Sequence, residues 1–120
     1  MKIALGLGCD RNTPLATVKA AIASSALALV LTTAVTEEIL WRGYVVERLG
    51  AWIGPVVAAA IGLTVFTLGH VTFFGAGWLV SVLPGAAATY ALLLWRRNLY
   101  ACMLCHAIGN VPIVAVALAR

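Results

Sequence analysis

Two adjacent glutamates, an arginine and two histidines interrupt the otherwise apolar stretches of this 120-residue sequence. Glu37 and Glu38 follow a run without charged residues that begins at Ala20, and Arg42 comes one helical turn after Glu38. A carboxylate or an imidazole can take up and release a proton during catalysis. Such groups are costly to place in an apolar environment, and proteins that keep them generally use them. The alternative is that the glutamates only end an apolar helix at the water boundary.

The spacing of these residues indicates that each group lies on one face of a helix. Glu38 and Arg42 are four residues apart, with the acid before the base, which is the more favourable order for an ion pair on a helix. The same spacing recurs in two further pairs, Phe66 with His70 and His106 with Asn110. Each of three helices is therefore expected to present a polar or aromatic patch.

The composition places these helices in a membrane. Hydrophobic residues make up 63% of the chain and charged residues only 10%, against about 25% charged residues in soluble domains. Residues 49–95 and 98–119 contain no Asp, Glu, Lys or Arg. The net charge of +4 comes from cations at the edges of the apolar runs, so we expect the lipid bilayer as partner and no nucleic acid.

The pattern predicts an all-α, polytopic membrane helix bundle with about four transmembrane helices. A segment at 1–13 is expected to lie outside the membrane and residues 14–120 to form the core. The expected helices cover residues 14–49, 55–71, 79–95 and 99–119. Turns are expected at 50–55, 73–78 and 96–98, with a break or late start at Pro84-Gly85 and a bend near Pro112. The loops 50–55 and 96–98 lie on one face, which collects Arg48, Arg96 and Arg97 and is expected to be cytoplasmic.

These helices can bring three ionisable side chains to similar depths. Counted from the loop face at 1.5 Å per residue, Glu37 lies about 18 Å deep, His70 about 23 Å and His106 about 11 Å. Because the helix bounds and tilts shift such depths by several ångströms, we expect the three side chains to converge inside the bundle.

The three motifs in this order resemble those of the CPBP intramembrane protease family, which includes the CAAX prenyl endopeptidases and the bacterial abortive-infection-type proteins. The resemblance runs from about Thr32 to Asn110 and extends to Gly85 and Tyr90. It implies an intramembrane endopeptidase that acts on a membrane-associated peptide or protein in the cell (inner) membrane. Family members commonly have additional flanking helices, so the resemblance supports the fold more strongly than activity.

The resemblance also implies roles for the site residues. Glu37 would be the general base that activates water, and His70 would help to hold that water. His106 and Asn110 would bind the oxyanion of the tetrahedral intermediate. Glu38 and Arg42 would support Glu37, with Phe66 beside His70.

The need for a metal is left open by the sequence. Glu37, His70 and His106 have the donor types of a catalytic zinc site, in which two histidines and a glutamate leave one position for water. A metal-free mechanism in which the glutamate activates water is the other reading. The residue types are compatible with both the zinc mechanism and the metal-free mechanism.

Two other functions are also considered. One is a catalytically inactive membrane protein with an immunity or binding role. The other is a haem-bearing membrane subunit, because Cys102, Cys105 and His106 form the C-x-x-C-H spacing of c-type haem attachment. We do not expect haem, because the motif lies within an uncharged span, where small buried cysteines are common.

The N-terminus shows two weaker patterns, and the oligomeric state is left open. Residues 1–22 resemble the start of a small soluble cobalamin-biosynthesis domain. Cys9 is a candidate lipoprotein site, for which the residues before it are a poor match. An oligomer could supply the walls that so short a bundle lacks.

Overall fold

The computed structural model describes residues 14–119, and all the regular structure in this range is helical. The expected segment 1–13, Cys9 and the first part of the resemblance at 1–22 lie outside the described residues. The elements are α1 (Leu15–Glu37), η1 (Glu38–Val46), α2 (Glu47–Ile53), α3 (Pro55–Phe74), η2 (Ala76–Trp78), α4 (Leu79–Arg96), α5 (Leu99–Gly109) and α6 (Val111–Ala119). The prediction of an all-α fold is confirmed.

Four helical stretches in the described part of the chain are long and apolar enough to cross a membrane. They cover Leu15–Ile53, Pro55–Phe74, Ala76–Arg96 and Leu99–Val116. Large apolar side chains are exposed along them, which is expected where lipid is the solvent. The predicted membrane bundle of four spans is therefore confirmed.

The first span is one continuous helix made of α1, η1 and α2. Its 39 residues correspond to about 58 Å at 1.5 Å per residue, which exceeds a hydrocarbon core of about 30 Å. The helix continues to Ile53, so the turn expected at 50–55 is confined to Gly54. Gly54 has a φ of 88°, a conformation that glycine adopts without a steric penalty, and Pro55 then starts α3.

The middle of this first helix is a π-helix, which the sequence pattern did not predict. Its buried residues, Glu38, Arg42 and Val46, continue a row that starts with Val30 and Ala34 at the same four-residue spacing. Four residues of an α-helix overshoot one turn by about 40°, so such a row drifts around the helix. A π-helix closes hydrogen bonds five residues apart and rotates less per residue. The π segment therefore turns the row back toward the bundle.

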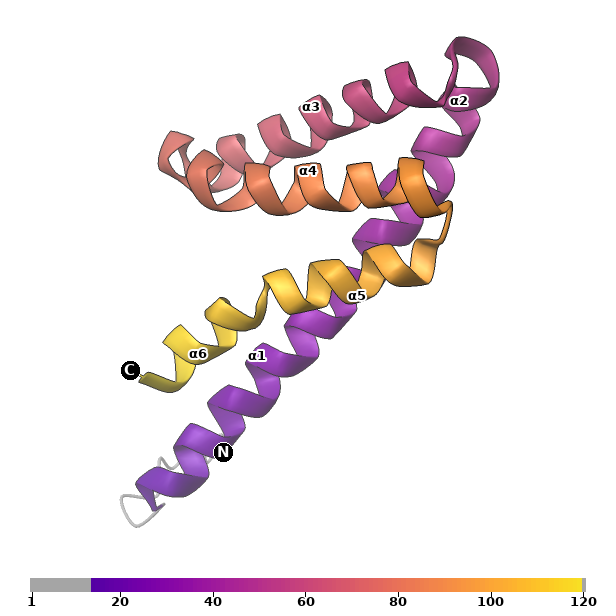
Figure 1. Ribbon diagram of the computed structural model, residues 1–120. Coiled ribbons are helices and arrows are strands. Elements are labelled where there is room, and N and C mark those ends of the chain that lie inside the picture. The colour runs from indigo at the N-terminus through magenta and orange to yellow at the C-terminus, as the bar shows by residue number, and fades with distance from the viewer. Residues whose placement is uncertain (1–13, 120) are drawn as a thin grey trace, which may run out of the picture.

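Helices α3 and α4 form a hairpin, which Figure 1 shows beside the upper part of the first helix. The hairpin turns at Gly75, whose φ is 85°, and at the short 3-10 helix η2. Helix α4 then runs through Pro84 without interruption, so the break expected at Pro84-Gly85 is wrong. The missing N–H of Pro84 leaves one carbonyl of the preceding turn without its usual donor, but this loss does not end the helix.

The last span returns along α1 and is broken into α5 and α6 (Figure 1). The interruption lies at Asn110, two residues before Pro112, where the bend was expected. A proline disfavours the α conformation of the residue before it and cannot donate a backbone hydrogen bond. Helix α5 starts at a proper N-cap, because the Asn98 side chain accepts a hydrogen bond from the Ala101 N–H at 3.1 Å.

The π segment η1 packs between α3 and α5, and small residues allow this close approach. Val46 of η1 packs in a buried cluster with Ala58 and Ala59 of α3 and Tyr90 of α4. Small side chains let helices in a membrane come close enough for van der Waals contact to hold them together. This junction fixes the helices that carry the polar residues.

The first prediction concerns this junction. Ala58→Leu is expected to lower the free energy of unfolding by about 1–3 kcal/mol, because Ala58 has 0% exposure and no room for a larger side chain. The measurement is thermal unfolding of the purified protein in detergent. Ala60→Leu on the exposed side of the same helix is the control and should change little. Equal unfolding temperatures for both variants would contradict the packing described here.

Candidate active site

The centre of the site is a buried ion pair between Glu38 and Arg42. The Arg42 Nη1 atom lies 3.0 Å from Glu38 Oε1, and the side chains have exposures of 1% and 0%. The pair expected from the four-residue spacing is thus present. Separating two charges in so apolar a surrounding is unfavourable, so each side chain holds the other in place.

Arg42 makes contacts with three further side chains from two other helices. Its Nη2 donates a hydrogen bond to Thr89 Oγ1 at 2.6 Å. Its guanidinium carbon lies 4.1 Å from the ring centroid of Tyr90 and 4.7 Å from that of Phe66. Cation–π contacts are strongest where the cation is removed from water. The guanidinium is therefore held by rings from α3 and α4 as well as by its acid.

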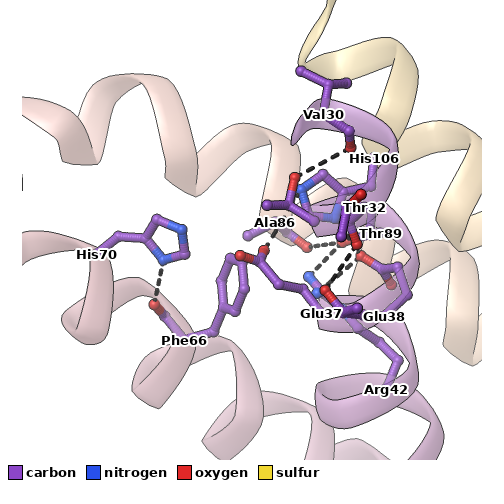
Figure 2. Close-up of polar contacts among 12 residues, drawn as sticks. Val30, Thr32, Glu37, Glu38, Arg42, Phe66, His70, Ala86, Thr89 and His106 are labelled. Atoms are coloured by element: carbon purple, nitrogen blue, oxygen red, sulfur yellow. Dashed lines mark hydrogen bonds and ion pairs between the residues drawn. The ribbon is translucent and has the colours of Figure 1, made fainter. Parts of the chain in front are cut away.

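His106 connects the two glutamates (Figure 2). Its Nδ1 lies 2.7 Å from Glu38 Oε1, and its Nε2 lies 3.7 Å from Glu37 Oε2. The first distance is that of a strong, charge-assisted hydrogen bond, and the second is longer than a hydrogen bond. Because a carboxylate oxygen accepts, Nδ1 carries a proton and the ring is fixed with Nε2 toward Glu37. The expected convergence of helices at Glu37 and His106 is present.

Glu37 differs from Glu38 in its exposure. Its side chain is 29% exposed, whereas Glu38 is fully buried. No protein hydrogen-bond donor holds the Glu37 carboxylate among the described residues. Of the two acids, Glu37 is the one that a water molecule or a substrate can reach.

His70 lies to the side of this cluster. Its Nδ1 is 2.9 Å from the backbone carbonyl oxygen of Phe66 (Figure 2). The ring centroids of His70 and Phe66 are 4.4 Å apart. Since a carbonyl only accepts, Nδ1 donates and Nε2 keeps its lone pair. Neither nitrogen is within 4 Å of a carboxylate oxygen of Glu37 or Glu38. His70 therefore joins the site through Phe66, whose ring also contacts Arg42 and His106.

Asn110 occupies the break between α5 and α6. Its backbone N–H donates to the carbonyl of His106 at 3.1 Å, and its side chain is partly buried. The structure shows no hydrogen bond from the Asn110 amide to another described side chain. The Asn110 amide thus lies at the end of α5, one turn after His106, and its N–H groups have no hydrogen-bond partner among the described side chains.

The residues proposed as metal ligands are not gathered around one point. Among residues 14–119, no group of three His, Cys, Asp or Glu side chains has the geometry to hold an ion. Glu37 and His106 approach each other, but His70 is separated from both. The zinc hypothesis therefore stays a prediction that this geometry does not support.

The C-x-x-C-H residues are arranged for packing. Cys102 has 0% exposure, and its Sγ lies 3.5 Å from the carbonyl oxygen of Thr89. Both nitrogens of the His106 ring face carboxylates. Haem attachment needs accessible thiols and an imidazole free to bind iron, so this geometry does not favour the haem alternative.

Thr89 is the site residue that the sequence analysis missed, and Tyr90 was noted there only for its place in the resemblance. A buried arginine needs several acceptors, so a hydroxyl on a neighbouring span could have been sought as its partner. The sequence offers many threonines, and most of those described bond to a carbonyl of their own helix, such as Thr64 to Ala60. Only the packing of α4 against η1 distinguishes Thr89 from them.

Comparison with known families identifies a match that extends over most of the chain. A family model described as Rce1-like, type II CAAX prenyl endopeptidase, matches residues 19–112. This range covers most of the chain and contains every residue of the site. No curated protein and no solved structure matches the chain.

The second prediction tests the buried pair. Glu38→Gln is expected to lower the free energy of unfolding by about 3–5 kcal/mol, because it leaves the Arg42 charge buried without its acid. Thermal unfolding in detergent measures this loss. Glu47→Gln, which removes an exposed acid of the same helix, should shift it by no more than about 0.5 kcal/mol. A Glu38→Gln protein as stable as the control would show that the pair does not hold the bundle together.

Proposed function

Because the chain belongs to the Rce1-like family of type II CAAX prenyl endopeptidases, we propose that it is an intramembrane endopeptidase in which Glu37 activates a water molecule. The family and the four candidate spans make it a CAAX-protease-like, multi-pass membrane protein. The substrate proposed is a membrane-associated peptide or protein, and the location proposed is the cell membrane. The observation that carries the proposal is the accessible Glu37 carboxylate 3.7 Å from the Nε2 of an oriented His106.

The proposed reaction begins with proton transfer from water to the Glu37 carboxylate. The water oxygen forms a bond to the carbonyl carbon of the scissile peptide, and the carbonyl oxygen becomes an oxyanion. The C–N bond then breaks as the leaving nitrogen takes the proton from Glu37, giving a carboxylic acid and an amine. The carboxylate thus acts first as base and then, protonated, as acid.

His106 is proposed to hold Glu37 in place for this proton transfer. Its Nδ1–H is bound by Glu38, so the ring cannot rotate without breaking a buried hydrogen bond. Histidines in other sites are oriented by a carboxylate on one nitrogen while the other acts on the reacting group. When Nε2 also carries a proton, it can donate to Glu37 or to the oxyanion beside it.

His70 and Asn110 are proposed to complete the site from its two sides. The fixed tautomer of His70 leaves Nε2 as a hydrogen-bond acceptor, which suits it to orient the attacking water. The Asn110 amide supplies neutral donors of the kind that stabilise an oxyanion. These roles rest on the donor and acceptor properties of the two side chains and on their place in the family pattern.

The third prediction tests the base. Glu37→Gln is expected to reduce cleavage of a membrane-tethered reporter by at least about 100-fold, because the amide cannot accept the proton. Thermal unfolding should stay near that of the wild type, since Glu37 is partly exposed and outside the Arg42 pair. The assay uses purified protein in liposomes, with Glu47→Gln as the matched charge control. Full activity in Glu37→Gln would contradict the assignment.

The fourth prediction tests His70. His70→Asn offers an amide donor near the position of Nδ1 but removes the Nε2 acceptor. We expect kcat to fall by about 10- to 100-fold, while thermal unfolding changes little. An active His70→Asn protein would mean that His70 only packs against Phe66.

A further inference from the structure

Half of the side-chain partners of Arg42 come from α4, a helix that supplies no residue of the proposed reaction. Of its four side-chain partners, Thr89 and Tyr90 both belong to α4. Glu38 comes from its own helix, and Phe66 comes from α3. Helix α4 therefore fixes a charge that is linked to Glu37 by three successive contacts, through Glu38 and His106.

The Thr89 hydroxyl has a defined direction. It donates to the carbonyl oxygen of Ala86 at 2.8 Å, so its lone pairs are available to Arg42 Nη2 at 2.6 Å. Thr89 is 2% exposed, which leaves it little access to solvent. Most other described threonine hydroxyls bond only within their own helix, whereas this one also joins two helices. It is the acceptor that sets where the far end of the guanidinium lies.

Tyr90 fixes the plane of the same guanidinium, and Gly62 makes room for it. A Cβ at position 62 would lie 2.8 Å from the Tyr90 hydroxyl oxygen, which is closer than real contacts allow. Without a side chain there, the Tyr90 ring can lie against one side of Arg42, with Phe66 as another aromatic contact. The guanidinium is thus restrained in tilt by rings and in position by Thr89.

The position of the Arg42 guanidinium affects His106 through one oxygen atom, Glu38 Oε1, which contacts both side chains. Glu38 Oε1 accepts from His106 Nδ1 at 2.7 Å and is also the atom 3.0 Å from Arg42 Nη1. If the guanidinium moves, this oxygen has to follow it or lose the contact, and either change alters the hydrogen bond to His106. The orientation of Nε2 toward Glu37 depends on that bond.

We propose that Thr89 is a positioning residue for the reaction: through Arg42 and Glu38, it sets the orientation of His106 beside Glu37. The effect on turnover rests on the function proposed above. The effect of Thr89 on the orientation of His106 does not rest on the proposed function, and that orientation can be measured without a substrate.

The test compares Thr89→Val, which removes the acceptor with almost no change in shape, with Thr89→Ser, which keeps it. The first readout is NMR of the protein labelled with ¹⁵N-histidine, in which the only two imidazoles are His70 and His106. Thr89→Val should shift the His106 Nδ1 and Nε2 signals and leave those of His70 in place. Thr89→Ser should restore the wild-type spectrum. His70→Asn assigns the two sets of signals.

The second readout is cleavage of the membrane-tethered reporter. Thr89→Val should lower kcat by about 10- to 100-fold with little change in KM, the size of loss typical when the partner that orients a functional histidine is removed. Thr89→Ser should stay within about threefold of the wild type. Thr64→Val, which removes an exposed hydroxyl of α3, is the control for loss of a threonine. If Thr89→Val does not fold, Thr89→Ala removes the same acceptor without adding bulk.

The outcomes separate this inference from the proposed function. His106 signals that are unchanged in Thr89→Val overturn the inference, whatever the cleavage rates are. Shifted His106 signals with a wild-type kcat also overturn it, because the orientation would then not matter for the reaction. A wild-type protein that cleaves no reporter contradicts the proposed function, and the NMR result then decides whether Thr89 orients His106.

Discussion

The structure depends on keeping the charges of Glu38 and Arg42 together away from water. Glu38 Oε1 lies 3.0 Å from Arg42 Nη1, and the exposure of each side chain is 1% or less. The protein offsets the cost of burying them with contacts from three helices: a hydroxyl and an aromatic ring from α4, a second ring from α3 and an imidazole from α5. Because all of these contacts converge on one pair, the pair determines how the helices are placed relative to one another. A bundle in a membrane gains little from the hydrophobic effect between helices, so polar contacts and close packing are the forces available.

The two neighbouring acids, Glu37 and Glu38, differ in their contacts and in their exposure. Glu38 has a structural role, because it pairs with Arg42 and accepts a hydrogen bond from one nitrogen of His106. Glu37, one residue earlier, points its carboxylate toward the other nitrogen and remains partly exposed. Adjacent residues on a helix point about 100° apart, so one acid can face the interior while the other stays partly exposed. In the proposed reaction the two glutamates therefore have different roles, Glu38 in positioning His106 and Glu37 as the base.

Hydropathy and spacing were sufficient to predict the four spans, the Glu38–Arg42 pair and the approach of His106 to Glu37. The helix ends differ from the prediction by at most a few residues, mainly because Gly54 and Gly75 make the turns shorter than expected. The π segment could not be predicted, because both faces of a membrane helix are apolar and the periodicity that would reveal a wider turn is weak. The role of Thr89 could not be predicted either, because its partner lies on a distant span and most of the described threonines bond within their own helix. His70 was expected at the centre, but a hydrogen bond to its own helix holds its ring beside Phe66.

The π-helical stretch of the first helix has a consequence for how the chain can change in length. A turn of π-helix contains an extra residue compared with a turn of α-helix. The segment η1 is therefore equivalent to an α-helix into which a residue has been inserted. Losing one residue there would let the backbone return to α geometry while the helix beyond it kept its angular setting. Losing one residue from α1 would instead rotate everything before it by about 100° relative to the bundle. The π segment thus adjusts the rotation between α1 and α2, and the buried row that runs from Val30 to Val46 stays on the side of the first helix that faces the bundle.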